Sequence, residues 1–337
     1  MVFFTTCLAA VVLAAAACAR PTPVTLKARQ EGGGAVAGDA NMDVLVVKYA
    51  RGLELLESEF YRQVITQNAR TGFFNNKQIE QMTKILDTED AHATALQQAL
   101  SAAGGPLIRP CKYKFDLSDA NTILTTATIL EEGGQAAYQG AAPLLQDKKI
   151  LATAASILTV EAQHSTVLRM LGDREPVARP FTNSLNPPDV STLVEGFIES
   201  CEDDSNPLRL VPPNPQLQTQ PTPGTPQANS QLSANPPTNR AATTGAVNGA
   251  TFLRFSIASG GLAQSPSRQA AAVAAAPLPS ASEAKFCAFV EGPSARFVDY
   301  AEPQGCQQPD DLVKPGYVML TRERDVSTVL AGPMPIP

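Results

Sequence analysis

Residues 82–100 of the chain read MTKILDTEDAHATALQQAL. Apolar residues recur every three or four positions along this stretch, which is typical of an amphipathic α-helix. Glu89 and His92 stand three positions apart, and residues with that spacing lie on the same face of a helix. This face is the apolar one, because methionine, isoleucine and leucine residues flank the pair within one or two turns. The stretch therefore predicts a helix that turns a carboxylate and an imidazole toward the protein core.

The same pattern returns at residues 154–168, AASILTVEAQHSTVL, where Glu161 precedes His164 by three positions on another apolar face. The chain has two histidines in all, and each follows a glutamate in this way. One such pair alone is explained equally well as a surface or helix-stabilising pair. Two pairs on two apolar faces favour a shared site, because a buried carboxylate costs several kcal/mol unless it is paired or bound to a metal.

Two further segments each add a glutamate that a tyrosine follows. Glu54 begins the pattern in LELLESEFY, and Glu131 begins it in LEEGGQAAY. Tyr61 and Tyr138 come seven positions after these glutamates, two helical turns along the same face. We predict a catalytic role for both tyrosines, with their hydroxyl groups bonded to metal ligands. Packing in the core explains the two tyrosines equally well.

The four segments together predict a two-metal site. One glutamate from each of two helices and one Glu-x-x-His pair from each of two others is the ligand scheme of di-iron and di-manganese carboxylate bundles. The predicted ligands are Glu54, Glu89, His92, Glu131, Glu161 and His164. Two divalent ions balance the charge of four carboxylates, and we predict iron, two ions per chain, with manganese as the alternative. Glu57 and Glu132 remain alternative ligands.

The apolar periodicity predicts four long helices between residues 43 and 171. Their expected ranges are 43–68, 75–103, 119–142 and 148–171. Ser118 is the predicted N-cap of the third helix, and glycine and proline residues end the second and the fourth. A shorter helix is expected near residues 190–199. The predicted fold class is mainly α, with a four-helix bundle at residues 40–205.

The remainder of the chain has a different composition. Residues 206–240 contain nine prolines among glutamine, asparagine and threonine, which predicts a disordered, extended linker over residues 206–245. Residues 246–337 are predicted to form a small β segment. Its β-like runs lie at residues 251–257, 285–290 and 317–321. An alanine-rich stretch near residues 270–276 is left unassigned.

The first residues predict export. Residues 2–19 carry no charge and contain an alanine-rich apolar run, and Ala17-Cys18-Ala19 has the small-x-small form of a cleavage site. We therefore predict a signal peptide at residues 1–19, with attachment of a lipid at Cys18 as the alternative. The apolar run is short for a membrane span. We expect a secreted protein, extracellular or in a cell wall, with no integral membrane span.

Cleavage leaves four cysteines. They are Cys111, Cys201, Cys287 and Cys306. An even number of cysteines in an exported chain favours disulfides. We predict the pairs Cys111–Cys201 and Cys287–Cys306, because each pair then lies within one of the two predicted domains.

The charge pattern excludes nucleic acid as a partner. The net charge is −6, from 26 basic and 32 acidic residues, and the sequence has no run of lysine and arginine. Binding to phosphates requires clustered cations. The expected partners are metal ions and O₂ or peroxide, while assembly into homo-oligomers and association with a cell wall are left open.

Residues 43–201 resemble the ferritin-like domain of plant desiccation-related proteins and of exported fungal stress-response and late-sexual-development proteins. The motifs that carry this resemblance are LELLESEFY at 53–61, Glu89-x-x-His92, GQAAYQGAA at 134–142, EAQH at 161–164 and FIESC at 197–201. The tail, from Leu320-Thr-Arg to the LAGP at 330–333, is similar to the end of the fungal members. The resemblance implies a helical bundle and a two-metal site, but not an activity, because one fold supports many functions.

Two functions are compatible with these observations. The first is a redox protein whose two-metal centre acts on O₂ or peroxide, as a ferroxidase or a catalase does. The second is a structural or cell-wall-associated protein of stress, desiccation or sexual development that keeps the ligands without turnover. Metal content and activity of the purified protein distinguish the two.

Overall fold

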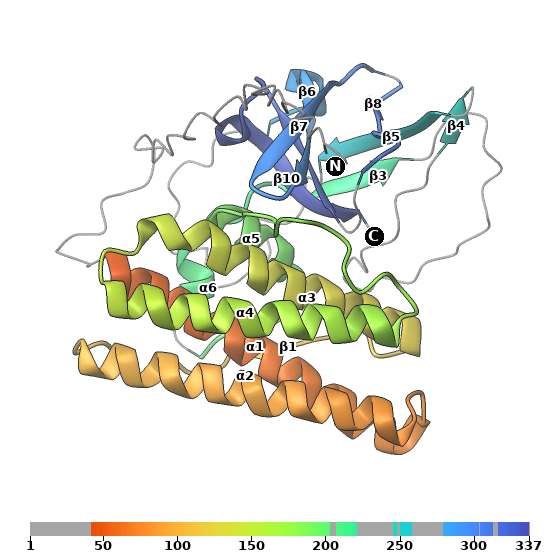
Figure 1. The fold of residues 1–337 in the computed structure, drawn as a ribbon. Helices are drawn as coiled ribbons and strands as arrows, with labels where there is room; N and C mark the ends of the chain where they lie inside the picture. Colours follow the sequence, from red (N-terminus) through yellow and green to blue (C-terminus); the bar gives the residue numbers. More distant parts are fainter. Residues whose placement is uncertain are drawn as a thin grey trace, which may run out of the picture. The chain divides into compact units, whose positions relative to one another are not determined.

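The computed structural model describes residues 42–202, 207–220, 245–247, 250–257, 279–302, 304–312 and 316–336. Four long helices lie side by side and form a bundle (Figure 1). They are α1 (Met42–Thr71), α2 (Asn76–Ala102), α3 (Ala120–Ala141) and α4 (Lys148–Leu171). The four helices predicted from the apolar periodicity are confirmed, with ends that differ by a few residues at most.

Side chains just before the helices satisfy the free N–H groups of the first turns. The N-cap of α3 is Asp119, whose Oδ1 accepts a hydrogen bond from the backbone N–H of Thr122 at 2.9 Å. The prediction of Ser118 as the cap was therefore wrong by one residue, because serine and aspartate are both good caps and stand next to each other here. Gly172 ends α4, as predicted.

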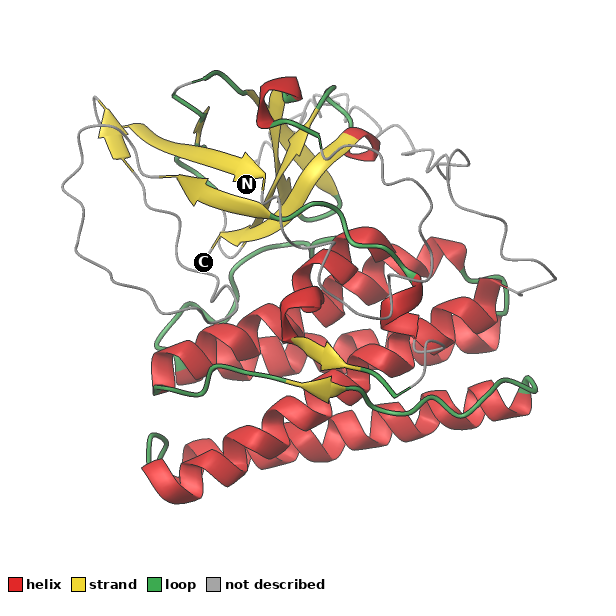
Figure 2. Cartoon of the chain, turned by 180° about the vertical axis from the view of Figure 1, so that it is seen from behind, coloured by secondary structure: helices red, strands yellow, loops and turns green. Residues whose placement is uncertain are grey.

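A disulfide between Cys111 and Cys201 joins the connection between α2 and α3 to the segment that follows the bundle. Beside this disulfide, β1 (Lys112–Tyr113) pairs antiparallel with β2 (Ile198–Ser200). Figure 2 shows these two short strands lying against the helices. The two cysteines are separated by 90 positions in the sequence. Closing a loop of that size stabilises the fold by about 4–5 kcal/mol in the loop-entropy description.

The short helix after the bundle begins and ends earlier than predicted. Helix α5 covers Pro187–Val194, and a 3₁₀ turn follows at Glu195–Phe197. The predicted range 190–199 was wrong at its end, because residues 198–200 are extended and pair with β1 as strand β2.

Part of the predicted linker is ordered. Residues 207–220 contain a helical turn, α6 (Pro207–Leu210), and a strand, β3 (Leu217–Gln220). Leu208 is only 1% exposed, and a Cβ atom added at Gly52 of α1 would lie 3.0 Å from its Cγ. The prediction of an extended linker was therefore wrong for these residues. A proline-rich composition does not prevent single leucines from being buried in a core formed by other segments.

The C-terminal part contains antiparallel strands in two sheets. One sheet has the order β10-β9-β6-β7, and the other has the order β3-β5-β4 with β8 paired to β5. The remaining strands are β4 (Gly245–Val247), β5 (Ala250–Ile257), β6 (Phe286–Glu291), β7 (Ser294–Asp299), β8 (Cys306–Gln307), β9 (Gly316–Thr321) and β10 (Val329–Ile336). The three predicted β runs correspond to β5, β6 and β9. Strand β10 was not predicted; its two prolines, Pro333 and Pro335, are tolerated because it lies at a sheet edge.

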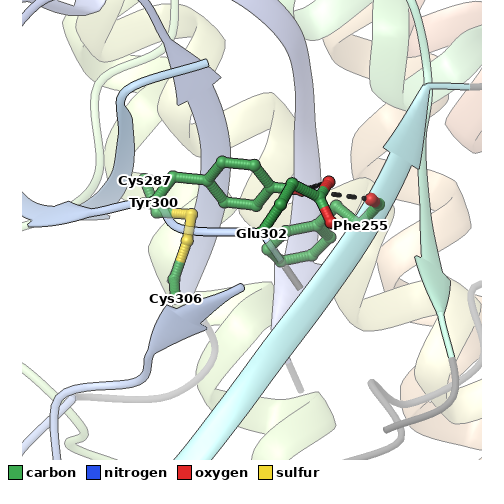
Figure 3. Close-up of a disulfide and its surroundings, with 5 residues drawn as sticks. All are labelled: Phe255, Cys287, Tyr300, Glu302 and Cys306. Carbon is green, nitrogen blue, oxygen red and sulfur yellow. Dashed lines mark hydrogen bonds between the residues drawn. A yellow bond between two sulfur atoms is a disulfide. The ribbon is translucent and has the colours of Figure 1, made fainter. Parts of the chain in front are cut away.

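The second predicted disulfide, Cys287–Cys306, is also confirmed, and it joins β6 of one sheet to β8 of the other. Figure 3 shows the ring of Tyr300 beside this disulfide. The Tyr300 hydroxyl donates a hydrogen bond to Glu302 at 2.6 Å and lies 3.4 Å from the backbone oxygen of Phe255.

Two asparagines connect the helical part to the strands. The Oδ1 atom of Asn183 accepts a hydrogen bond from the backbone N–H of Gly292 at 2.8 Å. The amide of Asn214 donates to the backbone oxygen of Gly332 at 3.0 Å and to Asp189 of α5 at 2.8 Å. These bonds satisfy buried backbone groups where helices and strands meet.

No helix among the described residues is long and apolar enough to cross a membrane. Three predicted features lie outside the described residues. They are the signal peptide at 1–19, the linker residues 221–244 and the alanine-rich stretch at 270–276.

Two glycines of α3 provide a matched test of helix packing. A Cβ atom at Gly140 would overlap the backbone oxygen of Leu185, whereas a Cβ atom at Gly133 would meet nothing closer than Leu193, at 3.8 Å. We expect Gly140→Ala to lower the free energy of unfolding by about 1–3 kcal/mol through overpacking. Gly133→Ala should change it by less than about 1 kcal/mol, since alanine favours the helix. Urea denaturation measures both, and equal effects would contradict this packing.

Candidate metal centre

The structure brings the six predicted ligands together inside the bundle. They are Glu54 from α1, Glu89 and His92 from α2, Glu131 from α3, and Glu161 and His164 from α4. The four glutamates are completely buried, at 0% exposure. The side chains of the two histidines are 11% and 7% exposed, so within this set only the imidazoles reach solvent. The Glu-x-x-His spacing explains the arrangement, because i and i+3 share one helix face.

The ligand atoms fall into two groups. In each group, one atom per residue lies within 4.8 Å of the others. The first, which we call the His92 position, consists of Glu54, Glu89, His92 and Glu161. The second, the His164 position, consists of Glu89, Glu131, Glu161 and His164. Glu89 and Glu161 belong to both groups, which is the arrangement expected of carboxylates that bridge two ions.

Both imidazoles turn Nδ1 toward the carboxylates. The Nδ1 atom of His92 lies 3.2 Å from Oε2 of Glu54 and 3.5 Å from Oε2 of Glu89. The Nδ1 atom of His164 lies 2.8 Å from Oε1 of Glu89 and 3.0 Å from Oε2 of Glu131. The two oxygens of Glu89 thus face different histidines, one in each position.

Thr88 gives the outer nitrogen of His164 a hydrogen-bond partner. Its Oγ1 lies 2.8 Å from Nε2 of His164 and donates to the backbone oxygen of Ile85 at 2.7 Å. Oγ1 can therefore accept a hydrogen bond from Nε2–H, and this arrangement would leave Nδ1 to a metal ion when one is bound. Thr88 was not predicted from the sequence as part of the site. The corresponding residue of the second Glu-x-x-His segment is Val160, so no repeat pointed to a hydroxyl here.

The two tyrosines bind glutamates of the opposite helix. Tyr61 of α1 donates a hydrogen bond to Oε1 of Glu131 at 2.5 Å, and Tyr138 of α3 donates one to Oε1 of Glu54. The i+7 spacing places each tyrosine on the face of its own glutamate, but the bond crosses the bundle. Burial, together with the accepting carboxylate, raises the pKa of both phenols well above the usual value. Both hydroxyls therefore remain donors at neutral pH.

The alternative ligands have different surroundings. Both carboxylate oxygens of Glu132 are engaged, one by Arg169 and the other by Arg179, and neither belongs to the cluster. Glu57 is 3% exposed and lies beside the cluster, although it belongs to neither group of four.

Burial and like charge dominate the electrostatics of the bridging glutamates. Burial raises the pKa of Glu89 and Glu161 well above the usual value, and neighbouring carboxylates raise it further. Burial by itself would lower the pKa of His92, but Glu161, Glu54 and Glu89 outweigh it and raise this pKa to about 12. For His164, Glu131 likewise outweighs burial and raises the pKa. Without metal, these side chains therefore bind protons, and the protons offset the negative charge of the buried carboxylates.

The carboxylate oxygens and imidazole nitrogens of the cluster suit metal ions. None of the four carboxylate oxygens of Glu89 and Glu161 receives a well-directed hydrogen bond among the described residues, although Nδ1 of His164 lies 2.8 Å from one of them. A buried carboxylate oxygen without a donor is costly, and a coordinated cation removes that cost. Mixed carboxylate and imidazole ligands suit iron and manganese. The role of each residue as a ligand remains a prediction.

Fold and site together define a helical-bundle protein with a buried cluster of glutamates and histidines that could hold metal. Residues 42–173 match the family model of the ferritin-like domain, and this part of the chain is therefore a ferritin-like domain. The resemblance inferred from the motifs is confirmed at this level. The comparison with curated proteins finds no match.

Removing the Thr88 hydroxyl should weaken metal binding without disturbing the helix. We expect Thr88→Val to lower Mn²⁺ affinity at the His164 position by about tenfold, because the outer nitrogen of His164 loses its acceptor. Thr94→Val is the matched control, since its hydroxyl binds the backbone oxygen of Asp90 on the exposed side of the same helix. Titration followed by the EPR signal of free Mn²⁺ measures both. Equal affinities of the two variants would contradict the assigned role.

The metal-free protein should lose stability as the pH rises from about 5 to about 8. The folded-state pKa values of Glu89, Glu161 and His92 are all raised, so the native state binds more protons than the unfolded chain in this range. Stability therefore falls with rising pH, whereas the lowered pKa of Glu54 acts below this range. Thermal unfolding in the presence of a chelator tests this. An unfolding temperature that rises with pH would contradict it.

Proposed function

We propose that this protein is an exported ferritin-like protein that binds two iron ions per chain, with manganese as the alternative, and uses them in reactions of O₂, peroxide or iron. The observation that carries this proposal is the sharing of Glu89 and Glu161 between two groups of four ligands. Two separate single-metal sites would not need a shared carboxylate. Four carboxylates also match the charge of two divalent ions.

Glu89 and Glu161 would bridge the two ions. Glu54 and His92 would complete one position, and Glu131 and His164 the other. Bound iron or manganese supplies one-electron redox steps and Lewis acidity.

The tyrosines would limit how the terminal glutamates bind. Oε1 of Glu131 accepts the Tyr61 hydroxyl, while Oε2 faces His164. Oε1 of Glu54 accepts the Tyr138 hydroxyl, while Oε2 faces His92. Each terminal glutamate would thus offer one oxygen to its ion.

Export and biological role rest on other observations. Two disulfides are compatible with an oxidising, extracellular environment. The resemblance to exported fungal and plant proteins supports a role in stress, desiccation or sexual development.

Metal analysis of secreted protein, combined with two assays, tests the proposal. We expect about two iron or manganese ions per chain, as the two ligand groups imply. His92→Ala and His164→Ala should keep the bundle folded and should each lower occupancy to about one ion. Oxidation of Fe²⁺ and consumption of H₂O₂, measured on the same preparation, distinguish ferroxidase from catalase chemistry.

The outcomes separate the two functions. Wild-type protein that takes up neither metal, with or without oxygen, would contradict the two-metal site. Full occupancy without either reaction would favour a structural role in the cell wall. Arg62→Ala is the control variant, because Arg62 is exposed and pairs with Glu59 and Asp90 on the bundle surface.

A further inference from the structure

The two halves of the bundle, α1 with α2 and α3 with α4, carry the same set of predicted metal ligands. They differ one helical turn after the glutamates of α1 and α3. Glu54 of α1 corresponds to Glu131 of α3, as the tyrosine seven positions after each one shows. Three positions after Glu54 stands Glu57, whereas three positions after Glu131 stands Gly134. The cluster therefore has a fifth carboxylate on one side and no side chain on the other.

Gly134 provides the space that Glu57 occupies. A Cβ atom at position 134 would lie 2.8 Å from Oε1 of Glu57 and 3.1 Å from Oε2 of Glu161. A side chain at this position would push against both carboxylates. The glycine in the middle of α3 costs about 1 kcal/mol in helix propensity, which the close approach of Glu57 explains.

Among the described residues, no basic side chain forms an ion pair with Glu57. The side chain is 3% exposed. After burial itself, the largest effects on its pKa come from Glu161, Glu89, Glu54 and Glu131, all of which raise it. Glu132 offers a contrast on the opposite helix, because its buried carboxylate is held by two arginines. A buried carboxylate whose charged neighbours are other carboxylates lies in a region that attracts cations.

The geometry also indicates which metal position Glu57 faces. Oε1 of Glu161 lies 3.4 Å from Nδ1 of His92, so this oxygen belongs to the His92 position. The other oxygen, Oε2, is the one beside Gly134 and Glu57. Along α1, Glu54 belongs to the His92 position alone, whereas Tyr61, two turns later, bonds Glu131 of the His164 position. Glu57 stands between Glu54 and Tyr61 and is therefore displaced toward the His164 position.

We propose that Glu57 is an additional ligand of the ion at the His164 position and that it makes the two metal positions unequal. This inference rests on the proposed two-metal site. With Glu57, the His164 position has four carboxylates and one imidazole, whereas the His92 position has three carboxylates and one imidazole. The extra negative charge gives the His164 position the higher affinity for a cation, so this position fills first.

Mn²⁺ titration of the full chain under anaerobic conditions tests the inference, with the EPR signal of free Mn²⁺ as the readout. The Mn²⁺ affinity of each position is measured separately. The His92→Ala variant leaves the His164 position to be measured, and the His164→Ala variant leaves the His92 position. We expect Glu57→Gln to weaken binding at the His164 position by about tenfold, as loss of a charged metal partner does. Binding at the His92 position should change by less than about twofold.

Two further variants make the result decisive. Glu59→Gln is the matched control on the same helix, because Glu59 pairs with Arg62 at the surface and should leave both affinities unchanged. Glu57→Ala also removes the carboxylate, should weaken the His164 position in the same way, and decides the matter if Glu57→Gln does not fold by circular dichroism. An equal effect of Glu57→Gln on both positions, or none, would overturn the assignment of Glu57 while leaving the two-metal site intact. Wild-type protein that binds no Mn²⁺ and no Fe²⁺ would instead overturn the site itself.

Discussion

Four glutamates without solvent exposure share the core of one helical bundle, and the surrounding structure has to compensate for this concentration of negative charge. Burying a single unpaired carboxylate costs several kcal/mol, and mutual repulsion increases the cost for each neighbour. Two histidines lie within the cluster, but the oxygens of Glu89 and Glu161 receive no well-directed hydrogen bond among the described residues. Protons can lower the charge, but two divalent cations neutralise it completely. The cluster could therefore hold metal ions, and bound cations would remove this cost.

The rest of the bundle holds these groups in position. Tyr61 and Tyr138 each connect α1 to α3 through a glutamate of the other helix, so that neither carboxylate can turn away. Thr88 orients one imidazole from the neighbouring helix. The Cys111–Cys201 disulfide closes the bundle by joining the connection between α2 and α3 to the segment after α5. Rigid placement of ligands in this way is what a bridged two-metal centre needs, since small displacements would separate the shared oxygens from one ion.

Much of this arrangement was predictable from the sequence, because its signals are local. Apolar periodicity predicted the four helices, and the Glu-x-x-His spacing predicted that the glutamate and the histidine of each pair lie on one helix face. The crossed tyrosine bonds were not predictable, because a spacing of seven identifies a helix face but not the neighbour across it. The contact of Thr88 with His164 was not predictable, because the residue before Glu161, which corresponds to Thr88 before Glu89, is Val160 and has no hydroxyl group. Leu208 was assigned to a linker because prolines surround it, yet it packs into a core formed by distant residues.

Anomalous diffraction from crystals grown with Mn²⁺ would show whether two metal ions share Glu89 and Glu161. We expect two anomalous peaks inside the bundle, one beside Nδ1 of His92 and one beside Nδ1 of His164, with a Glu89 oxygen next to each. A single peak, or density only at surface carboxylates such as Asp90, would contradict it.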